Sequence, residues 1–541
     1  MQLLTASQMR KIEQAAIARG EATGLELMEK AGQGVVDAIF AHWPEIATVE
    51  STNVDFSQQS KVKARQALVL CGPGHNGGDG FVVARLLAVL GWQVQVFLFG
   101  NADRLPKDAR VTFERWNAIG DVHAWDDPAI EAMIERGQHD LIIDALFGIG
   151  LTRAMPKQLE RTRQAITTQV TTSPSLTRYQ KYVAIDMPSG LCAESGADFG
   201  ACPADLTVTF HAPKLGHYLL HHGQNGGGPG MCGALRVADI GLDHENDASF
   251  TTMASPHRNL TAKFSNLHKY SHGHAFVLSG GSGQTGAARL AARGALRVGA
   301  GLVTLGVPPN AQLEVACHVT AIMVRRVPDA PKLEHILLDA RLNALCVGPG
   351  FGTGAAQQEL IGAALDSKRP IVLDADALSV LRFDQDAALA GKLHKNCVLT
   401  PHDGEFRRMF PDLAAKMRVQ LETGPAYSKV DATRDAAERA GCVVLFKGPD
   451  TVIADQDGSC IVHGAFYGRD APWLATAGSG DVLAGFIAGL MARGIKPIQA
   501  AETAAWLHVE CARSFGPGLI AEDLPEQVPA VLRGLQNAWA G

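Results

Sequence analysis

At 541 residues, the chain is too long for one hydrophobic core, and ordinary domain sizes predict roughly two to four folding units. Apolar residues make up 46% of it and charged residues 19%, and its 57 glycines fit an α/β protein with many tight strand-to-helix turns. The net charge is −6 and no basic block occurs, so we expect neither a nucleic-acid partner nor binding to an anionic membrane surface.

The cysteines and the N-terminus both indicate a reducing compartment. The ten cysteines are spaced singly, without a Cys-x-x-Cys pair, which disfavours a zinc site or a disulfide framework. The first residues read as the start of an amphipathic helix, not as a signal peptide, and no apolar run reaches membrane length. We therefore expect a cytoplasmic protein without a membrane segment.

The first half alternates short apolar runs with helical segments. Strands are predicted at 67–70, 94–99, 141–143, 182–185 and 206–210, with a Gly-rich loop and a helix over 81–90 after the first strand. Continuous apolar strands separated by helices indicate a mainly parallel sheet covered on both faces. The pattern predicts a Rossmann-like, three-layer α/β/α domain over 1–242.

The alternation restarts after a polar, broken stretch from Leu242 to about Phe264, which predicts a second α/β domain over 265–541. Its strands are predicted at 274–278, 302–307, 344–347, 371–373, 397–399 and 443–446, and its first helix at 287–298. A hairpin is predicted from 451–454 to 459–462 through Asp457-Gly458. Segments 51–66 and 167–180 are polar and predict surface insertions.

Two glycine-rich loops, Gly72–Gly77 and Gly281–Gly286, satisfy Gly-x-Gly-x-x-Gly between a strand and a helix. A dinucleotide-binding fold also needs an acidic residue about 20 residues further on, at the end of the next strand. Asp103 lies too far beyond the strand in the first half, and nothing acidic follows Val307 in the second. The loops are predicted to contact phosphates or backbone, and redox use of NAD is disfavoured.

Residues Ala475–Asp481 place small side chains and a carboxylate directly before an apolar helix. Exposed N–H groups and the positive end of the helix dipole make such a junction a binding site for phosphate. A carboxylate there would repel phosphate, so Asp481 is better explained as a base beside a transferring phosphoryl group. A tight turn with Asp481 as a first-turn residue is the alternative. Gly-x-Gly-Asp at a helix start resembles the anion hole and base of ribokinase-like phosphotransferases.

Three oxygen-bearing residues of the first half, Asn76, Asp144 and Ser189, lie at or just beyond the ends of predicted parallel strands, where α/β sheets bind ligands. Such oxygens suit an alkali or alkaline-earth cation. Asp186 adds a second carboxylate to the same crevice. Helix capping is the alternative for each residue alone. A site is favoured because four loops converge there, namely Gly72–Gly80, Asp144–Ala154, Asp186–Leu191 and Phe210–Gly216.

Residues 1 to about 240 resemble the NAD(P)H-hydrate epimerase family through Leu25–Gly32, Gly72–Gly80, Asp144–Leu151 and Ala184–Leu191. The resemblance implies a potassium ion bound by Asn76, Asp144 and Ser189, and Asp186 as the acid/base at the hydroxylated carbon. It implies two loops that bind the hydrated nucleotide, formed by His75, Asn76, Gly77, Gly78 and Asp79 and by Gly148, Ile149, Gly150, Leu151, Thr152, Arg153 and Ala154. His75 and Ile149 depart from the Asn and Thr that the family often has, and Ile149 removes a hydroxyl from a binding loop.

The second half carries strand-end motifs at Val347–Gly352, Thr400–Glu405 and Lys447–Thr451. Lys447 suits a phosphate and Thr451 a nucleotide, although a solvated lysine and a turn histidine at His402 are the alternatives. No P-loop motif occurs.

With Thr285–Arg289 and Gly299–Val303, these motifs resemble the ADP/ATP-dependent NAD(P)H-hydrate dehydratase family, which has a ribokinase-like α/β fold, over about 265 to 535. The resemblance implies a set of residues that contact the hydrate, namely Ala287, Gly350, Gly352, His402 and Asp481. It implies a second set that binds the adenine nucleotide, namely Lys447, Gly448, Pro449, Asp450, Thr451 and Gly480.

The two resemblances together imply a bifunctional enzyme that repairs hydrated NADH and NADPH (NADHX and NADPHX). The first half would interconvert the R and S epimers. The second would dehydrate the S epimer with ADP and Mg²⁺, giving AMP and phosphate, through a phosphorylated intermediate whose hydroxyl proton Asp481 accepts. ADP rather than ATP, and a homo-oligomer, are expectations. An ordinary ribokinase-like kinase of a vitamin alcohol and a non-catalytic nucleotide-binding scaffold are the alternatives.

Overall fold

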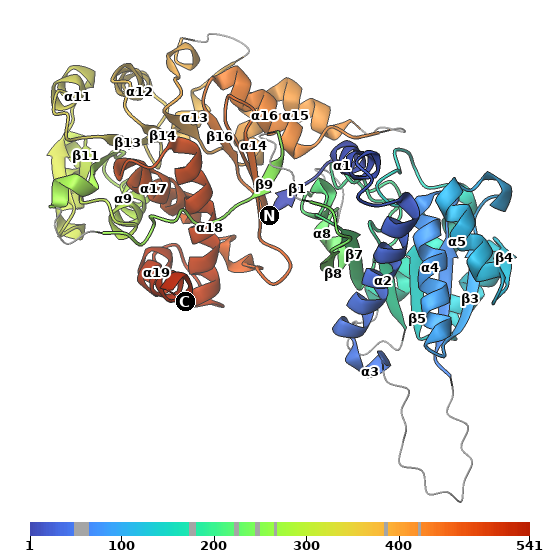
Figure 1. The fold of residues 1–541 in the computed structure, drawn as a ribbon. Coiled ribbons are helices and arrows are strands. Elements are labelled where there is room, and N and C mark those ends of the chain that lie inside the picture. Colours follow the sequence, from blue (N-terminus) through green and yellow to red (C-terminus); the bar gives the residue numbers. More distant parts are fainter. Residues whose placement is uncertain are drawn as a thin grey trace, which may run out of the picture. The chain divides into compact units, whose positions relative to one another are not determined.

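The computed structural model describes residues 1–47, 64–172, 180–220, 227–243, 249–263, 268–383, 388–419 and 424–540. The chain forms two compact units, Met1–Asp247 with Val419–Ser428, and Ala248–Arg418 with Lys429–Gly541 (Figure 1). A short segment from the second half of the chain therefore belongs to the first unit. The predicted insertion at 51–66 lies almost wholly outside the described residues. Of the one at 167–180, residues 167–172 form the end of a helix and 173–179 lie outside the described residues.

The first unit contains a seven-stranded, wholly parallel sheet in the order β4-β3-β2-β5-β6-β7-β8. Its strands are β2 (Gln66–Cys71), β3 (Gln93–Leu98), β4 (Val122–Ala124), β5 (Leu141–Ala145), β6 (Lys181–Ile185), β7 (Leu206–Phe210) and β8 (Ala234–Ala238). β2 is the first strand of this sheet along the chain, and its two neighbours are β3 and β5, so the connections run in opposite directions from it. Such a switch point leaves a crevice at the carboxyl ends of the two central strands, where ligands bind.

Side chains alternate between the two faces of this sheet, and helices cover both. Leu68 and Leu70 of β2 pack with helices α6 (Asp127–Glu135) and α7 (Glu160–Thr172) on one face. On the other face lie helices α2 (Gly24–His42), α4 (His75–Val89) and α5 (Lys107–Asn117), which pack on one another (Figure 1). The predicted three-layer α/β/α architecture is confirmed. The shorter helices are α1 (Ala6–Ala18), α3 (Pro44–Ala47) and α8 (Pro229–Cys232).

Helix α4 begins at His75, six residues before the predicted start at Phe81. The glycines that predicted a loop are inside the helix because neighbouring backbone and side chains leave no room for a Cβ. A Cβ on Gly77 would lie 2.0 Å from the Gly72 carbonyl oxygen, and one on Gly78 would lie 2.6 Å from the Met28 sulfur. The predicted binding loop from His75 to Asp79 is thus the first turn of a helix pressed against its surroundings.

The second unit contains one sheet whose own strands follow the order β9-β18-β17-β16-β15-β14-β13-β10-β11-β12. Strand β17 is antiparallel to both its neighbours, and the other pairs are parallel. The strands are β9 (Thr251–Met253), β10 (His274–Leu278), β11 (Leu302–Val307), β12 (Met323–Arg326), β13 (Ala344–Val347), β14 (Ile371–Leu373), β15 (Cys397–Leu399), β16 (Val443–Phe446), β17 (Asp450–Ala454) and β18 (Cys460–Gly464). The crevice at the carboxyl ends of the parallel strands here collects the ends of β10, β13, β14, β15 and β16.

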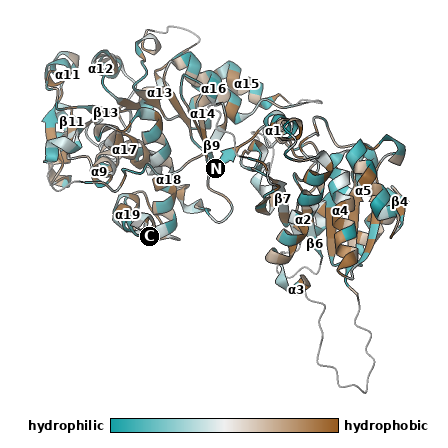
Figure 2. Cartoon of the chain, in the orientation of Figure 1, coloured by the Kyte–Doolittle hydropathy of each residue, from teal (hydrophilic) through white to brown (hydrophobic). Residues whose placement is uncertain are grey.

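Helices cover both faces of the second sheet. One layer holds α9 (Gly286–Arg297), α17 (Ser479–Ala492), α18 (Pro497–Phe515) and α19 (Asp523–Ala540), which share the main apolar core with the strands. The other helices are α10 (Gln312–His318), α11 (Ala330–Ile336), α12 (Ala355–Asp366), α13 (Asp376–Ser379), α14 (Asp403–Met409), α15 (Pro411–Arg418) and α16 (Lys429–Ala440). Figure 2 shows the strands and inner helix faces as hydrophobic and many outer faces as hydrophilic.

Helix α17 is buried on every side from Val482 onward, which explains its continuous apolar sequence. It packs unusually close to α9 because its glycines face the α9 backbone. A Cβ on Gly485 would lie 2.1 Å from the Ala291 carbonyl oxygen. This packing fixes the N-terminus of α17, and with it Asp481, beside the carboxyl ends of the parallel strands.

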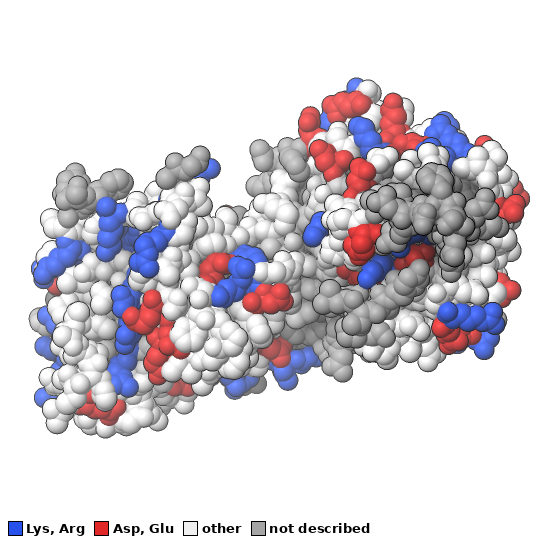
Figure 3. Space-filling view, turned by 90° about the horizontal axis from the view of Figure 1, so that it is seen from below, with Lys and Arg blue, Asp and Glu red and all other residues white. Residues whose placement is uncertain are grey.

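On the surface, Lys and Arg are interspersed with Asp and Glu on the visible face in Figure 3, in line with a total of 49 basic and 55 acidic residues. No helix in the described parts of the chain combines the length and hydropathy needed to cross a membrane.

Candidate active sites

The predicted potassium ligands of the first unit gather around the loop that follows β5. The hydroxyl of Ser189 donates to Asp144 Oδ1 at 2.6 Å, and the Ser189 N–H donates to Asp144 Oδ2 at 2.8 Å. Asn76 reaches the same loop, since its Oδ1 lies 3.2 Å from where a Cβ on Gly148 would be. Asn76 Nδ2 is buried without a hydrogen-bond partner. Asp144 and Ser189 are thus in direct contact, and a glycine at position 148 leaves room for the Asn76 side chain beside the same loop.

Asp186 lies at the end of β6 in an environment that keeps it ionised. Burial alone would raise the pKa of Asp186, but the Lys214 ammonium and hydrogen bonds from Lys214 and Thr209 outweigh burial and lower it. Lys214 Nζ lies 3.0 Å from Asp186 Oδ1, and Thr209 Oγ1 lies 2.9 Å from the same oxygen. The backbone of Asp186 has φ 64, a strained value for a residue with a side chain, and such strain gathers at functional sites.

Lys214 is one of the largest fully buried side chains in the chain. Its ammonium also donates to the carbonyl oxygens of Phe210 and Ala212. His217 Nε2 lies 2.9 Å from the Asp186 carbonyl oxygen, and burial lowers the pKa of His217 to about 4, so its ring is neutral. Sequence reasoning identified the loop Phe210–Gly216 but not Lys214 within it. No local signal marks Lys214, because it lies 28 residues after Asp186 in the sequence and a lysine in a loop is ordinarily solvated.

The two predicted substrate loops differ in exposure. In the first, His75 is exposed and Asn76 to Asp79 are buried. Burial, with the nearby Asp186 and Glu13 carboxylates, raises the pKa of Asp79 well above its usual range. In the second, the Ile149 N–H faces Asp186 Oδ2 at 3.4 Å, so the loop backbone meets the proposed acid/base directly. Leu151 is buried and 152–154 are exposed, and Thr152 accepts a hydrogen bond from the Gly424 N–H.

In the second unit, the predicted hydrate contacts Ala287, Gly350 and Gly352 line one hollow of about 570 Å³. Asp376 also lines it, and its Oδ2 accepts a hydrogen bond from the Gly352 N–H at 2.8 Å. Gly350 has φ 60 and Gly352 has φ 90, which only glycine adopts without strain. The hollow is therefore formed by a backbone that the glycines make possible.

Asp481 lies in the first turn of α17, three residues after the N-cap Gly478, whose φ is 87°. Burial raises the pKa of Asp481 to about 6, the neighbouring Asp374 carboxylate adds to the rise, and the Lys447 ammonium opposes it. A carboxylate with such a pKa is ionised at neutral pH and basic enough to accept a proton, which suits a general base.

Lys447 follows β16 and lies among carboxylates. Its Nζ is 2.9 Å from Asp374 Oδ1 and 3.7 Å from Glu405 Oε2. It also lies 3.6 Å from where a Cβ on Gly480 would be, so a side chain at Gly480 would meet it. Asp374 is held in turn by Thr400 Oγ1 at 2.7 Å. Asp374 and Glu405 were missed from the sequence, although Asp374 directly follows β14 and the strand-end rule would have found it.

Three other side chains that were predicted to contact ligands make hydrogen bonds or ion pairs within the protein instead. His402 is the N-cap of α14, where its Nδ1 accepts from the Gly404 N–H at 2.9 Å. Asp450 is buried against Lys429 at 2.7 Å, and Thr451 Oγ1 donates to the Gly448 carbonyl at 2.7 Å. The side chains of Asp450 and Thr451 thus shape the turn, and His402 keeps an exposed ring edge. Nucleotide contacts at 447–451 would fall to Lys447 and the Gly448–Pro449 backbone.

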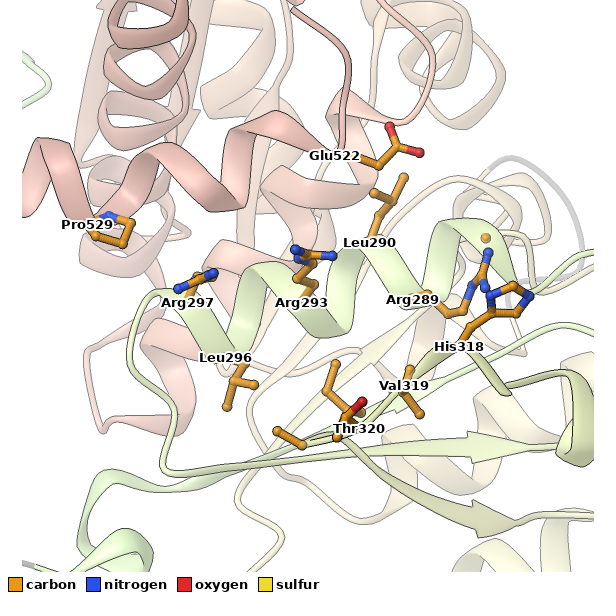
Figure 4. Close-up of a pocket in the computed structure, with 13 residues that line it drawn as sticks. Arg289, Leu290, Arg293, Leu296, Arg297, His318, Val319, Thr320, Glu522 and Pro529 are labelled. Carbon is orange, nitrogen blue, oxygen red and sulfur yellow. The ribbon is translucent and has the colours of Figure 1, made fainter. Parts of the chain in front are cut away.

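A cavity of about 680 Å³ lies elsewhere, along α9 (Figure 4). Arg289, Arg293 and Arg297 line it from successive turns of α9, and Glu526 pairs with the last two. It shares Gly286 with the hollow of the predicted hydrate site but contains none of the predicted catalytic or nucleotide-binding residues.

Comparison with known proteins covers both units. Residues 24–216 match the family described as the YjeF-related protein N-terminus, and residues 275–527 match the NAD(P)H-hydrate dehydratase family. The bifunctional NAD(P)H-hydrate repair enzyme of Moorella thermoacetica is 35% identical over 565 aligned residues, which cover 99% of this chain and 98% of that protein. The chain belongs to the bifunctional NAD(P)H-hydrate repair enzyme family.

Members of the family and its single-function relatives match each half. The NAD(P)H-hydrate epimerase of Roseobacter litoralis is 40% identical over 259 residues, covering 44% of this chain and 99% of that protein. The solved structure of the ADP/ATP-dependent NAD(P)H-hydrate dehydratase from Bacillus subtilis, crystallised with ATP and Mg²⁺, is 27% identical, covers 52% of this chain and 94% of that one, and has a TM-score of 0.43. The resemblance of this chain to the bifunctional repair enzymes, drawn from its sequence motifs, is confirmed.

Proposed function

We propose that the first unit of this chain epimerises NADHX and NADPHX and that the second unit dehydrates the S epimer at the expense of ADP. The observation that carries the proposal is the presence of two separate sites, each with its own reactive carboxylate. Asp186 is held ionised by Lys214 in one, and Asp481 lies at the start of α17 in the other. Each matches the half of the chain in which the family places that activity.

In the second site, Asp481 accepts the proton of the hydrate hydroxyl as its oxygen attacks the terminal phosphoryl group. The backbone N–H groups at the start of α17 stabilise the developing negative charge, and Lys447 contributes a fixed positive charge. The phosphorylated hydroxyl is then a competent leaving group, and the ring nitrogen lone pair expels phosphate to restore the reduced nicotinamide. The Gly350–Gly352 backbone orients the hydrate beside Asp481.

Mg²⁺ fits this site as an ion that arrives with the nucleotide. Among the described residues, no three His, Cys, Asp or Glu side chains are arranged to hold a metal. A Mg²⁺ bound to nucleotide phosphates needs only one or two protein carboxylates, and Asp374 and Glu405 would supply them. When bound, it would neutralise charge on the transferring phosphoryl group.

Potassium fits the first site through the chemistry of its donors. The Asn76 amide oxygen, the Asp144 carboxylate and the Ser189 hydroxyl are hard oxygen ligands without sulfur or imidazole, which suits an alkali cation. Such an ion would fix the loop from Asp144 to Gly148 beside Asp186. In this site, the Asp186 carboxylate would lie beside the hydroxylated carbon of the hydrate, where the reaction takes place.

Three further points stay predictions. ADP is proposed over ATP because bacterial two-domain members of the family, which this chain resembles, use ADP. A cytoplasmic location is proposed because none of the ten cysteines, all of which lie in the described residues, forms a disulfide, and nine of them are buried. The expected homo-oligomer would be checked by light scattering of the purified chain.

The test is recovery of the reduced-nicotinamide absorbance from a mixture of both hydrate epimers with K⁺ and Mg²⁺, in the presence of ADP, ATP or no nucleotide. The proposal predicts complete, nucleotide-dependent recovery. Recovery that stops when the S epimer is exhausted would remove the epimerase activity. A stable phosphorylated product instead of recovery would favour the vitamin-alcohol kinase.

A further inference from the structure

The first helix of the chain, α1, is attached to the first site by two contacts, one just before it begins and one at Arg10. Before α1 begins, the Leu4 N–H donates to the Pro213 carbonyl at 2.9 Å and the Leu215 N–H donates to the Leu4 carbonyl at 3.1 Å. Leu4 thereby forms a β-bridge with Lys214, the lysine that pairs with Asp186. Further along α1, the Arg10 guanidinium donates to the Ile149 carbonyl at 3.4 Å.

These two anchors bring one face of α1 to the substrate loop. Arg10 also lies 3.6 Å from where a Cβ on Gly150 would be. Glu13 follows Arg10 by three positions and so shares its face of the helix. Glu13 is partly buried, and the charges that act on it are Asp186, Lys214 and Arg10. The site also contains a hydrogen-bond donor that a ligand could use, because Asn76 is buried and its Nδ2 has no partner in the protein.

We propose that Glu13 is the proton-transferring residue of the first site and that Asp186 remains an anion throughout. The inference rests on the epimerase function proposed above. It assigns to α1 a catalytic role that none of the sequence motifs indicated.

The environments of Glu13 and Asp186 shift the pKa values of their carboxyl groups in opposite directions. Burial raises the pKa of Glu13 to about 6, and Asp186 adds to the rise against Lys214 and Arg10. The pKa of Asp186 lies below its usual range, because Lys214 and Thr209 outweigh its burial. Paired groups separated in this way divide the acid and anion roles between them. At neutral pH, Glu13 can gain and lose a proton, whereas Asp186 cannot easily gain one.

The reaction follows from these roles. The neutral Glu13 carboxyl gives its proton to the hydroxyl oxygen of the hydrate as the C–O bond breaks and water leaves. The ring nitrogen lone pair forms a C=N bond, which leaves a cationic ring beside the Asp186 anion. A water adds to the opposite face of the same carbon, the C=N pair returns to nitrogen, and the proton lost by that water restores neutral Glu13 through solvent. Atoms and charge balance, and the carbon is inverted.

Other groups around Glu13 do not supply the same titration. Burial raises the pKa of Asp79 on α4 well above its usual range, and His217 is neutral because burial lowers its pKa to about 4. Asp144 has a pKa raised to about 6 by burial, so a pH profile of the unaltered chain cannot by itself distinguish Asp144 from Glu13. Variants of Glu13 make that distinction.

The experiment measures conversion of the R to the S epimer by the full-length chain, with Glu13→Gln, Glu13→Asp and, as a matched control, Glu135→Gln at the exposed end of α6. We expect Glu13→Gln to lose about 100-fold or more of the epimerisation rate, the ordinary contribution of a general acid. Glu13→Asp should keep part of the rate, with the fall in rate at rising pH moved to lower pH than in the unaltered chain because aspartate has the lower ordinary pKa, and Glu135→Gln should match the unaltered chain. Dehydration of the pure S epimer should be unchanged in all three.

The outcomes separate this inference from the function on which it rests. Epimerisation by Glu13→Gln at the unaltered rate would overturn the role of Glu13 and leave the epimerase standing. Absence of epimerisation by the unaltered chain would overturn the epimerase itself. Loss of the first unit's thermal transition in Glu13→Gln would move the decision to Glu13→Asp, for which an unaltered rate with an unshifted pH profile would overturn the proposal.

Discussion

The Lys447 ammonium lies 2.9 Å from Asp374 Oδ1 in the second unit, beside the start of the helix that carries Asp481. Burial alone would lower the pKa of Lys447, but Asp374 and Glu405 outweigh burial and raise it. One partly buried cation therefore compensates several carboxylates, and Asp481 is left with the pKa of a usable base. The same residues that hold the lysine in place also set the basicity of Asp481.

Replacing Asp481 by Asn should abolish dehydration and leave epimerisation intact. The amide keeps the shape and the helix start but cannot accept the hydroxyl proton, so we expect a loss of about 100-fold or more in kcat. The measurement is recovery of reduced-nicotinamide absorbance from the pure S epimer, with R-to-S conversion followed separately in the same preparation. Loss of both activities would contradict two independent sites.

The dehydration rate should fall as the pH drops below about 6. Asp481 must be ionised to act as a base, and burial with Asp374 raises its pKa to about 6, so the active form is lost as the pH falls through that value. Lys447 opposes this rise, so replacing Lys447 by Met should move the acidic limb to higher pH while lowering the maximum rate. A limb that stays in place in the Lys447→Met variant would show that another group controls it.

Asp186→Ala should have the opposite selectivity to Asp481→Asn. Without the carboxylate, the first site loses its anion, and R-to-S conversion should fall by about 100-fold or more, the loss expected when a proton-transferring or electrostatic group is removed. Dehydration of the pure S epimer should be unaffected. Unchanged conversion of the R epimer would remove Asp186 from the mechanism.

Replacing Lys214 by Met should destabilise the first unit by about 3–5 kcal/mol, the usual cost of leaving one partner of a buried ion pair unpaired. The sign follows from Asp186, whose pKa in the folded state is lowered. The pair therefore stabilises the fold above the ordinary pKa of an aspartate, about 3.9, and this contribution is lost as the pH falls further. Thermal unfolding at pH 7 should show the first unit melting earlier in Lys214→Met, with the difference shrinking toward pH 3. An equal difference at both pH values would contradict the ion pair as its cause.

Most of the fold was predictable because buried strands and tight turns can be recognised from a few consecutive residues. The strands at Ala344–Val347, Ile371–Leu373 and Val443–Phe446 have the predicted bounds, and the hairpin turns at Asp457-Gly458 as predicted. The start of α4 was wrong because Gly77 and Gly78 indicate a loop by propensity, whereas their role is close packing, which depends on residues distant in sequence.

The candidate sites show the same division. Strand-end motifs and family resemblance brought out Asp144, Ser189 and Asp481, which the structure places in the two crevices. Lys214 and Glu405 could not be assigned roles in the same way, because a lysine or glutamate in a polar loop is ordinarily solvated. Only the fold shows that Lys214 is buried against Asp186, and that Glu405 is buried within reach of Lys447.

The close packing of α17 on α9 gives a final prediction with a matched control. A Cβ on Gly485 would lie 2.1 Å from the Ala291 carbonyl oxygen, whereas one on Gly534 in α19 would meet nothing within 4 Å. Gly485→Ala should therefore destabilise the second unit by about 1–3 kcal/mol through overpacking. Gly534→Ala should be neutral or stabilise it by up to about 1 kcal/mol through helix propensity. Because α17 carries Asp481, Gly485→Ala should also slow dehydration, while epimerisation in the first unit stays unchanged. Thermal unfolding and the two separate rate assays check this, and equal stabilities of the two variants would show that the contact between α9 and α17 relaxes freely.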